Sequence, residues 1–107
     1  MRDPFHQLLG LAYRAGRVVT GDELVLRAVR RGRVRLVILA ADASERTRKK
    51  WQDKCAFYAV PLVVTSDRTQ LGEALGKEQR VIIGVTDENF ARRLKELAGN
   101  DSLGVKA

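Results

Sequence analysis

Apolar residues along the chain follow two spacings, one typical of helices and one typical of buried strands. Apolar positions three and four residues apart predict helices over residues 4–15, 21–31, 44–58, 67–75 and 89–97. Continuous apolar runs predict strands over residues 36–41, 61–64 and 80–85, with a short strand or extended link at 18–19. Because helices alternate with strands, the pattern predicts an α/β fold, a three-layer α-β-α sandwich around a mixed sheet of about four strands. We expect residues 1–99 to form one domain and residues 100–107 to form a frayed C-terminal tail.

The second predicted helix has a defined start and a buried side. Thr20 and Glu23 have the Thr-x-x-Glu spacing of a capping box, and Gly32 marks the end of the helix. The spacing predicts an apolar stripe that faces the core, made of Leu24, Val25, Ala28 and Val29. Leu26 falls between this stripe and Arg30, so we expect it to point partly toward solvent.

The composition is that of an ordinary globular protein, with 45% hydrophobic and 31% charged residues. The longest apolar stretch, residues 55–64, contains Pro61 and is far shorter than the roughly 18 residues of a membrane span. The N-terminus has no basic-then-apolar signal peptide. Cys55 is the only cysteine, which suits a reducing compartment. We therefore expect a cytoplasmic protein without an internal disulfide.

The positive charge is concentrated in one half of the chain. The formal net charge is +7. Residues 1–50 hold 12 Lys and Arg against 5 Asp and Glu, whereas residues 51–107 hold 8 of each sign. Such a concentration indicates a polyanionic partner, either nucleic acid or an acidic membrane surface. The membrane is the weaker alternative, because the basic helix lacks a wide exposed apolar face.

Catalytic and metal-binding patterns are missing from the sequence. His6 is the only histidine and lies in a leucine-rich helix, whereas Cys55 lies on the inward stripe of another helix. The segment from Gly72 to Lys77 does not fit a phosphate-binding loop. An acidic pair at residues 87–88 is typical of a helix start. We therefore expect no catalytic residues, no metal site and no cofactor.

The second predicted helix combines a glycine at its start with a row of arginines. Its arginines are expected on the exposed side, and Glu23 relieves only part of their mutual repulsion. Gly21 has no side chain, so a ligand can approach the N–H donors and partial positive charge of the helix start. Taken one at a time, these features also fit a solvated helix face on which Gly21 only serves the turn. Taken together, they favour an anion-binding surface.

The ordered set of segments along the chain resembles a known family. Residues 21–32 and 34–43, followed by 60–62, 71–76 and 81–85, are similar to the L7Ae/L30e family of RNA-binding ribosomal proteins. The resemblance covers roughly residues 5–98. Residues 15–19 and 53–55 are similar to the small bacterial YlxQ-like branch of that family.

The resemblance implies an α-β-α sandwich that binds kink-turn RNA, a sharply bent helix with tandem sheared G·A pairs. Family members start their second helix with Gly-x-Asn-Glu-x-x-Lys, which Gly21 and Arg27 match, while Glu23 and Leu24 stand where Asn and Glu are usual. A second contact in the family comes from the loop before the last strand, here residues 76–80. The residues expected to contact RNA are Arg17, Thr20, Gly21, Asp22, Glu23, Arg27, Arg30, Arg31, Lys77, Arg80 and Val81.

The resemblance further implies ribosomal RNA as the structured RNA partner, with a riboswitch or small RNA as the alternative, ribosomal proteins as further partners and no DNA. One alternative is a protein-interaction module of the same fold, whose arginines hold an acidic protein. Another is an accessory domain for an RNA-modifying enzyme on a separate chain, because 107 residues leave no room for a catalytic domain as well. Competition by kink-turn RNA distinguishes the protein module from an RNA binder.

Overall fold

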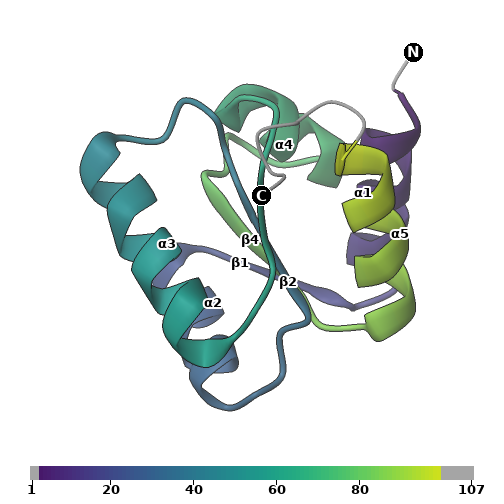
Figure 1. The fold of residues 1–107 in the computed structure, drawn as a ribbon. Helices are drawn as coiled ribbons and strands as arrows, with labels where there is room; N and C mark the ends of the chain where they lie inside the picture. Colours follow the sequence, from purple (N-terminus) through teal and green to yellow (C-terminus); the bar gives the residue numbers. More distant parts are fainter. Residues whose placement is uncertain (1–2, 100–107) are drawn as a thin grey trace.

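The computed structural model describes residues 3–99 and arranges them as helices on both faces of one sheet (Figure 1). The elements in chain order are α1 (Pro4–Arg14), β1 (Val18–Thr20), α2 (Asp22–Arg30), β2 (Leu36–Leu39), α3 (Glu45–Tyr58), β3 (Leu62–Val64), α4 (Arg68–Leu75), β4 (Ile82–Val85) and α5 (Glu88–Gly99). The predicted α/β sandwich is therefore confirmed. The expected tail at residues 100–107 lies outside the described residues.

The sheet has the strand order β1-β4-β2-β3 and is mixed. β4 runs antiparallel to both β1 and β2, whereas β2 and β3 are parallel and are connected through α3. The two central strands, β2 and β4, are buried at every position, as their continuous apolar runs predict. Their pairing brings Ile38 opposite Ile83 and Leu39 opposite Ile82.

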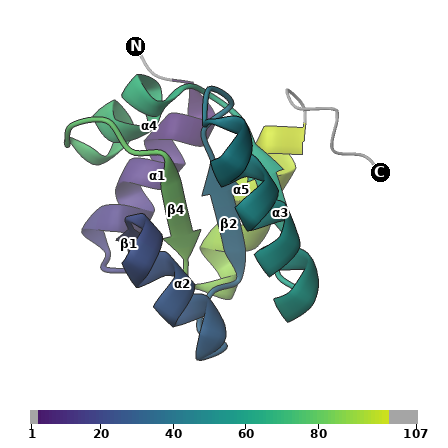
Figure 2. The same ribbon diagram turned by 90° about the vertical axis from the view of Figure 1, so that its left-hand side faces the viewer.

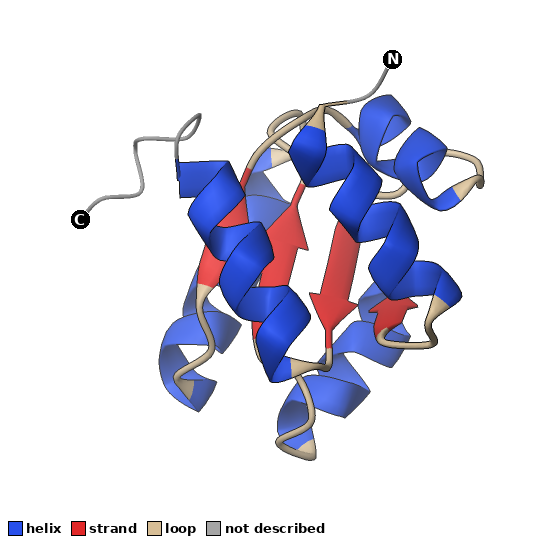
Figure 3. Ribbon diagram, turned by 90° about the vertical axis from the view of Figure 1, so that its right-hand side faces the viewer, coloured by secondary structure: helices blue, strands red, loops and turns tan. Residues whose placement is uncertain are grey.

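Each face of the sheet carries its own apolar core. Figure 3 shows α1 and α5 in front of one face, and the core there also includes α4 through Leu71 and Leu75. Figure 2 shows α2 and α3 on the opposite face, where Val25, Val29 and Trp51 pack against the sheet. We call this second cluster the α2–α3 core, and its buried residues are Val25, Val29, Val34, Val37, Leu39, Ala43, Trp51, Cys55 and Ile82. The sheet thus holds the N-terminal ends of α2 and α3 on the same side of the molecule.

The buried side of α2 differs from the predicted stripe. Val25 and Val29 are buried, but Leu24 is 54% exposed and Leu26 is partly buried against the α2–α3 core. The prediction was wrong for Leu24 because α2 packs on β1 and β4 through an arc that contains Ala28, Val25, Val29 and Leu26. Leu24 lies outside this arc and faces solvent.

A close backbone contact fixes the loop between α4 and β4. Lys77 N–H donates to the Gly72 carbonyl at 2.9 Å. A Cβ built on Gly72 would lie 2.1 Å from the Glu78 carbonyl oxygen, so only glycine fits there. The loop is therefore pressed onto α4, and it leads directly into the residues that precede β4.

Candidate nucleic-acid interface

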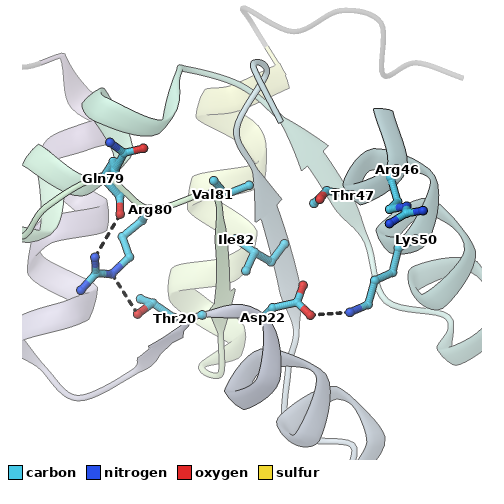
Figure 4. A pocket seen from close by; sticks show the side chains of 10 residues that line it. Thr20, Asp22, Arg46, Thr47, Lys50, Gln79, Arg80, Val81 and Ile82 are labelled. Carbon is cyan, nitrogen blue, oxygen red and sulfur yellow. Dashed lines mark hydrogen bonds and ion pairs between the residues drawn. The ribbon is translucent and has the colours of Figure 1, made fainter. Parts of the chain in front are cut away.

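A groove of about 690 Å³ opens between the start of α2, the start of α3 and the segment that enters β4 (Figure 4). Three stretches that are distant in sequence meet there because β1, β4 and β2 are adjacent in the sheet. We call it the α2–α3 groove, and the residues that line it are Thr20, Gly21, Asp22, Arg46, Thr47, Lys50, Gln79, Arg80, Val81 and Ile82.

Gly21 forms the bare start of α2 at this groove. Its φ of 95° lies in the region that favours glycine, and a Cβ built there would meet nothing within 4 Å. The Gly21 N–H donates to the Ile82 carbonyl at 3.2 Å, and its carbonyl accepts from Val25 N–H at 3.0 Å. The helix start is therefore held by backbone bonds alone, and its outer face is open.

The predicted capping box at Thr20 and Glu23 is wrong. Gly21 occupies the N-cap position, and no side chain among residues 3–99 accepts a hydrogen bond from the first turn of α2. Thr20 belongs to β1, and its hydroxyl faces Arg80 instead of the helix. The first-turn N–H groups of α2 therefore have no side-chain acceptor and are left for solvent or for an anion.

Asp22 connects the start of α2 to α3. Its carboxylate forms an ion pair with Lys50, and its Oδ1 accepts from the Trp51 indole N–H at 2.9 Å. Partial burial acts to raise the pKa of Asp22, but the hydrogen bonds from Lys50 and Trp51 outweigh it and lower the pKa below its ordinary value. Asp22 is thus a charged tie across the groove, and its carboxylate is already occupied (Figure 4).

Arg80 is fixed on the opposite edge of the groove. Its Nε donates to the Thr20 hydroxyl at 3.2 Å, and its Nη1 donates to the carbonyls of Glu78 and Gln79 at 3.2 and 3.0 Å. None of these acceptors is a carboxylate, so no ion pair among these contacts offsets the positive charge of Arg80. Figure 4 shows Arg80 and Lys50 on opposite sides of Thr20 and Asp22.

The groove lining is positively charged. Arg46, Lys50 and Arg80 contribute three positive charges against the single carboxylate of Asp22, a net of +2. The contribution of α3, namely Arg46, Thr47 and Lys50, was not predicted from the sequence. The available signal was the run of four basic residues within positions 46–50, which contains only Thr47 besides. The topology places this run beside Gly21.

The residues predicted from sequence divide into two groups. Thr20, Gly21, Asp22, Arg80 and Val81 meet in the α2–α3 groove. Six others do not line it, and these are Arg17, Glu23, Arg27, Arg30, Arg31 and Lys77. The α2 members of this second group are exposed along the helix that leads away from the groove. Arg17 lies just before β1, and the Lys77 ammonium lies 6.0 Å from the Tyr13 ring centroid.

His6 takes part in a row of polar contacts away from the groove. Its Nδ1 lies 2.7 Å from Asp3 Oδ1, and its Nε2 lies 2.8 Å from Ser66 Oγ. The two N–H groups that follow Ser66 are already used, because they donate to the side chains of Gln70 and Asp42. If Ser66 acted as a nucleophile, it would need free N–H donors nearby to stabilise an oxyanion. These two N–H groups are not free for that role. The row ties α1 to the loop that precedes α4.

The remaining candidates for chemistry are also accounted for. Burial raises the pKa of the Cys55 thiol to about 11, so it is almost entirely protonated at neutral pH. Within residues 3–99, no three histidine, cysteine or carboxylate side chains gather closely enough to hold a metal ion. No helix in that range has both the length and the apolar character needed to cross a bilayer.

Comparisons with known proteins identify relatives by sequence. The family model for ribosomal protein L7Ae/L30e/S12e/Gadd45 matches residues 3–95. RNA-binding protein YlxQ from Bacillus subtilis (strain 168) is 49% identical over 90 residues, which cover 84% of this chain and 90% of the relative. RNA-binding protein YlxQ from Enterococcus faecium is 40% identical over 90 residues, which cover 84% of this chain and 86% of the relative. Both relatives are named as RNA-binding proteins and not as enzymes, in agreement with the expected lack of catalysis.

Solved structures share the fold. A protein with unknown function from Bacillus halodurans C superposes with a TM-score of 0.88 at 47% identity, covering 91% of this chain and 98% of that one. The Giardia lamblia 15.5kD RNA binding protein superposes with a TM-score of 0.73 at 20% identity, covering 94% of this chain and 89% of that one, a likeness of fold alone. The resemblance to the family and to its bacterial YlxQ-like branch is confirmed. The chain belongs to the ribosomal protein L7Ae/L30e/S12e/Gadd45 family.

Proposed function

We propose that the protein binds structured RNA of the kink-turn type, in association with the ribosome or the translation machinery. The RNA occupies the α2–α3 groove and extends along the exposed arginines of α2. The observation that carries the proposal is the meeting of the bare helix start at Gly21 with Arg46, Lys50 and Arg80 around one groove. The names of the two bacterial relatives support RNA as the ligand.

Phosphates are the part of the RNA that the groove suits best. The first-turn N–H groups of α2 supply donors and the positive end of a helix dipole, and no side chain blocks them at Gly21. Lys50 and Arg80 stand on opposite sides of this point, so one or two phosphates can be held between fixed cations. Because Asp22 is paired with Lys50 and Trp51, its carboxylate repels phosphate less than a free one would.

Bent RNA benefits most from such a surface. A sharp bend brings phosphates from two strands together, and their repulsion opposes the bend. A protein that neutralises them shifts a flexible RNA toward its kinked state by as much as its affinity for the two states differs. Sequence-specific contacts then fall to the exposed side chains that follow Gly21. Glu23 can accept from guanine N1 and N2 donors, and Arg27 can donate to guanine acceptors.

The proposal is tested by titrating a kink-turn RNA and its twin in which the G·A pairs are replaced by Watson–Crick pairs. We expect tighter binding to the kink-turn RNA at fixed salt. The logarithm of affinity should fall with the logarithm of salt concentration with a slope of roughly two to three or more, because at least three groove cations displace counterions. Equal affinity for both RNAs would contradict the recognition of a kinked RNA. An affinity that does not change with salt concentration would contradict the binding of phosphates by the groove cations.

A pair of charge reversals separates the proposed surface from net charge. Arg27→Glu changes an exposed cation on α2, and Lys95→Glu makes the same change on α5, on the opposite face of the sheet. We expect Arg27→Glu to abolish kink-turn binding and Lys95→Glu to leave it nearly unchanged. Equal losses in the two variants would show that the protein is held only by its overall charge.

A further inference from the structure

Phe57 is the most exposed of the large apolar side chains that the structure describes. It lies near the end of α3, and 80% of its surface is open to solvent. Its ring meets the Tyr58 ring edge to face, with centroids 4.8 Å apart and planes at 83°. Tyr58 is itself packed against the α2–α3 core, so Phe57 contacts an anchored ring. The fold therefore presents a supported aromatic face to solvent.

Phe57 lies on the same side of α3 as the groove cations. Positions 46, 50, 54 and 57 are spaced by four, four and three residues, which aligns them along one side of a helix. Arg46 and Lys50 line the α2–α3 groove, and Lys54 and Phe57 line a smaller cavity of about 300 Å³ together with Asp53 and Tyr58. Lys50 and Phe57 are two helical turns apart, roughly 10 Å along the axis. The basic side of α3 thus leads from the groove to an exposed ring.

We propose that an unpaired nucleotide next to the kinked RNA stacks its base on Phe57 while the Lys54 ammonium holds its phosphate. This proposal rests on the proposed function, because the groove sets where the RNA leaves the protein. A base has a flat π-face whatever its identity, so an exposed ring next to a cation suits single-stranded RNA without demanding a sequence. We call Lys50, Lys54, Phe57 and the supporting Tyr58 the stacking platform.

Charge on α3 favours a nucleotide over an apolar protein surface. α3 carries five cations, Arg46, Arg48, Lys49, Lys50 and Lys54, against Glu45 and Asp53, a net of +3. The cavity beside Phe57 is bounded by Asp53 and Lys54 as well as by rings, and an apolar partner would have to desolvate both charges. A phosphate and a base would pair Lys54 and leave Asp53 exposed in its ion pair with Lys49.

The test uses three RNAs that share one kink-turn. The first is blunt at both ends, and the other two carry a short adenosine overhang at one end or the other. We expect one overhang to tighten binding by the wild-type chain about five- to a hundredfold, the range for one stacked base. Phe57→Ala should lose that gain and keep the affinity for the blunt RNA, whereas Phe57→Tyr should keep both. Leu11→Ala is the matched control, because Leu11 is a 51% exposed apolar residue on the far face of the sheet.

A fluorescence experiment reports the stacking directly. The wild-type chain has one tryptophan, Trp51, which is fully buried. Phe57→Trp adds an exposed indole, whose emission should be quenched by the overhang RNA and much less by the blunt RNA. The wild-type chain titrated with the same RNAs gives the contribution of Trp51.

Each other outcome overturns the inference in a recognisable way. If the blunt RNA binds but neither overhang changes affinity in a Phe57-dependent manner, the stacking platform is wrong and the proposed function stands. If no kink-turn RNA binds at all, both fall. If sedimentation shows a concentration-dependent dimer that Phe57→Ala abolishes, Phe57 contacts a second copy of the chain and not a nucleotide.

Discussion

The indole N–H of Trp51 donates to Oδ1 of Asp22 across 2.9 Å, so a fully buried side chain of α3 holds the first residue of α2. Asp22 is also paired with Lys50 of α3, one residue before Trp51. Two adjacent positions on one helix therefore fix the starting residue of another, right beside the bare N–H groups that follow Gly21. The shape of the α2–α3 groove depends on this tie, because it sets the separation of two of its three walls.

A double-mutant cycle measures the tie. Trp51→Phe removes the indole N–H and part of a buried ring, and we expect it to destabilise the fold by about 2–4 kcal/mol. Asp22→Ala removes the acceptor. The double variant should lose less than the sum of the single losses, with a coupling of about 1 kcal/mol or more. Free energies of unfolding in urea provide all four corners, and strict additivity would show that the contact contributes nothing to stability.

Acid should weaken the same tie. The folded-state pKa of Asp22 lies below its ordinary value of 3.8, since the bonds from Lys50 and Trp51 outweigh the effect of partial burial. A group with a lowered pKa stabilises the fold above its unfolded-state value, and this stabilisation is lost as the pH falls through the folded value. We therefore expect the advantage of the wild-type chain over Asp22→Asn to be constant near neutral pH and to shrink below about pH 4.

The comparison with Asp22→Asn isolates this carboxyl group from the others that titrate in acid. Asp3, whose pKa is lowered chiefly by the His6 backbone N–H, is present in both chains and cancels. The effect should be modest, because the Asp22 side chain is half exposed and solvent screens its ion pair. A difference between the two chains that grows on acidification would contradict the sign of the pKa shift.

The sequence predicted the architecture because its hydrophobic periodicity is strong and consistent. Buried runs at β2 and β4 and well-spaced apolar residues in the helices leave little freedom in element type. Exposure was harder to predict: Leu24 and Leu26 flank the Val25 and Val29 stripe on opposite sides of α2, and only the tertiary contact of the helix decides which one is covered. Local spacing does not contain that contact.

The candidate site was predictable only in part for the same reason. Gly21 was found from its place at the start of a basic helix and Arg80 from the family resemblance, and the structure brings them to one groove. Arg46 and Lys50 were missed because their run is more than twenty residues from Gly21, and a basic run at a helix start is usually a solvated face. The sheet topology and the shared core place α2 and α3 on one face of the sheet. Long-range neighbours of this kind need the sheet topology before any single segment can be interpreted.

Replacing Gly21 should destabilise the fold although its Cβ position has no close neighbours. Its φ of 95° and ψ of 143° are close to a backbone region almost restricted to glycine, so Gly21→Ala should destabilise the fold by about 1–3 kcal/mol. No atom lies within 4 Å of the added methyl group, so a clash does not contribute. The same methyl group would project into the space where we propose that a phosphate binds.

Binding and stability together distinguish these two effects. Under conditions where Gly21→Ala is fully folded, its affinity for kink-turn RNA should still be at least tenfold weaker than that of the wild-type chain. Gly99→Ala is the control, since a Cβ at Gly99 also meets nothing within 4 Å and lies at the far end of α5. If Gly21→Ala binds RNA as tightly as Gly99→Ala, the helix start is not the phosphate site.

Cys55 reports on the α2–α3 core from the inside. It is 4% exposed, and burial raises the pKa of its thiol to about 11, so both access and ionisation protect it from alkylation. The raised pKa alone lowers the fraction of reactive thiolate at pH 8 on the order of a hundredfold relative to an ordinary thiol. We expect iodoacetamide to react through transient opening of α3, and Trp51→Phe should raise the rate roughly tenfold for every 1.4 kcal/mol lost in opening.

The pH profile distinguishes reaction through the open state from reaction on the folded molecule. Reaction through the open state levels off near the pKa of an ordinary thiol, whereas a rate that keeps rising toward pH 11 would place the reaction on the folded molecule and contradict the opening route.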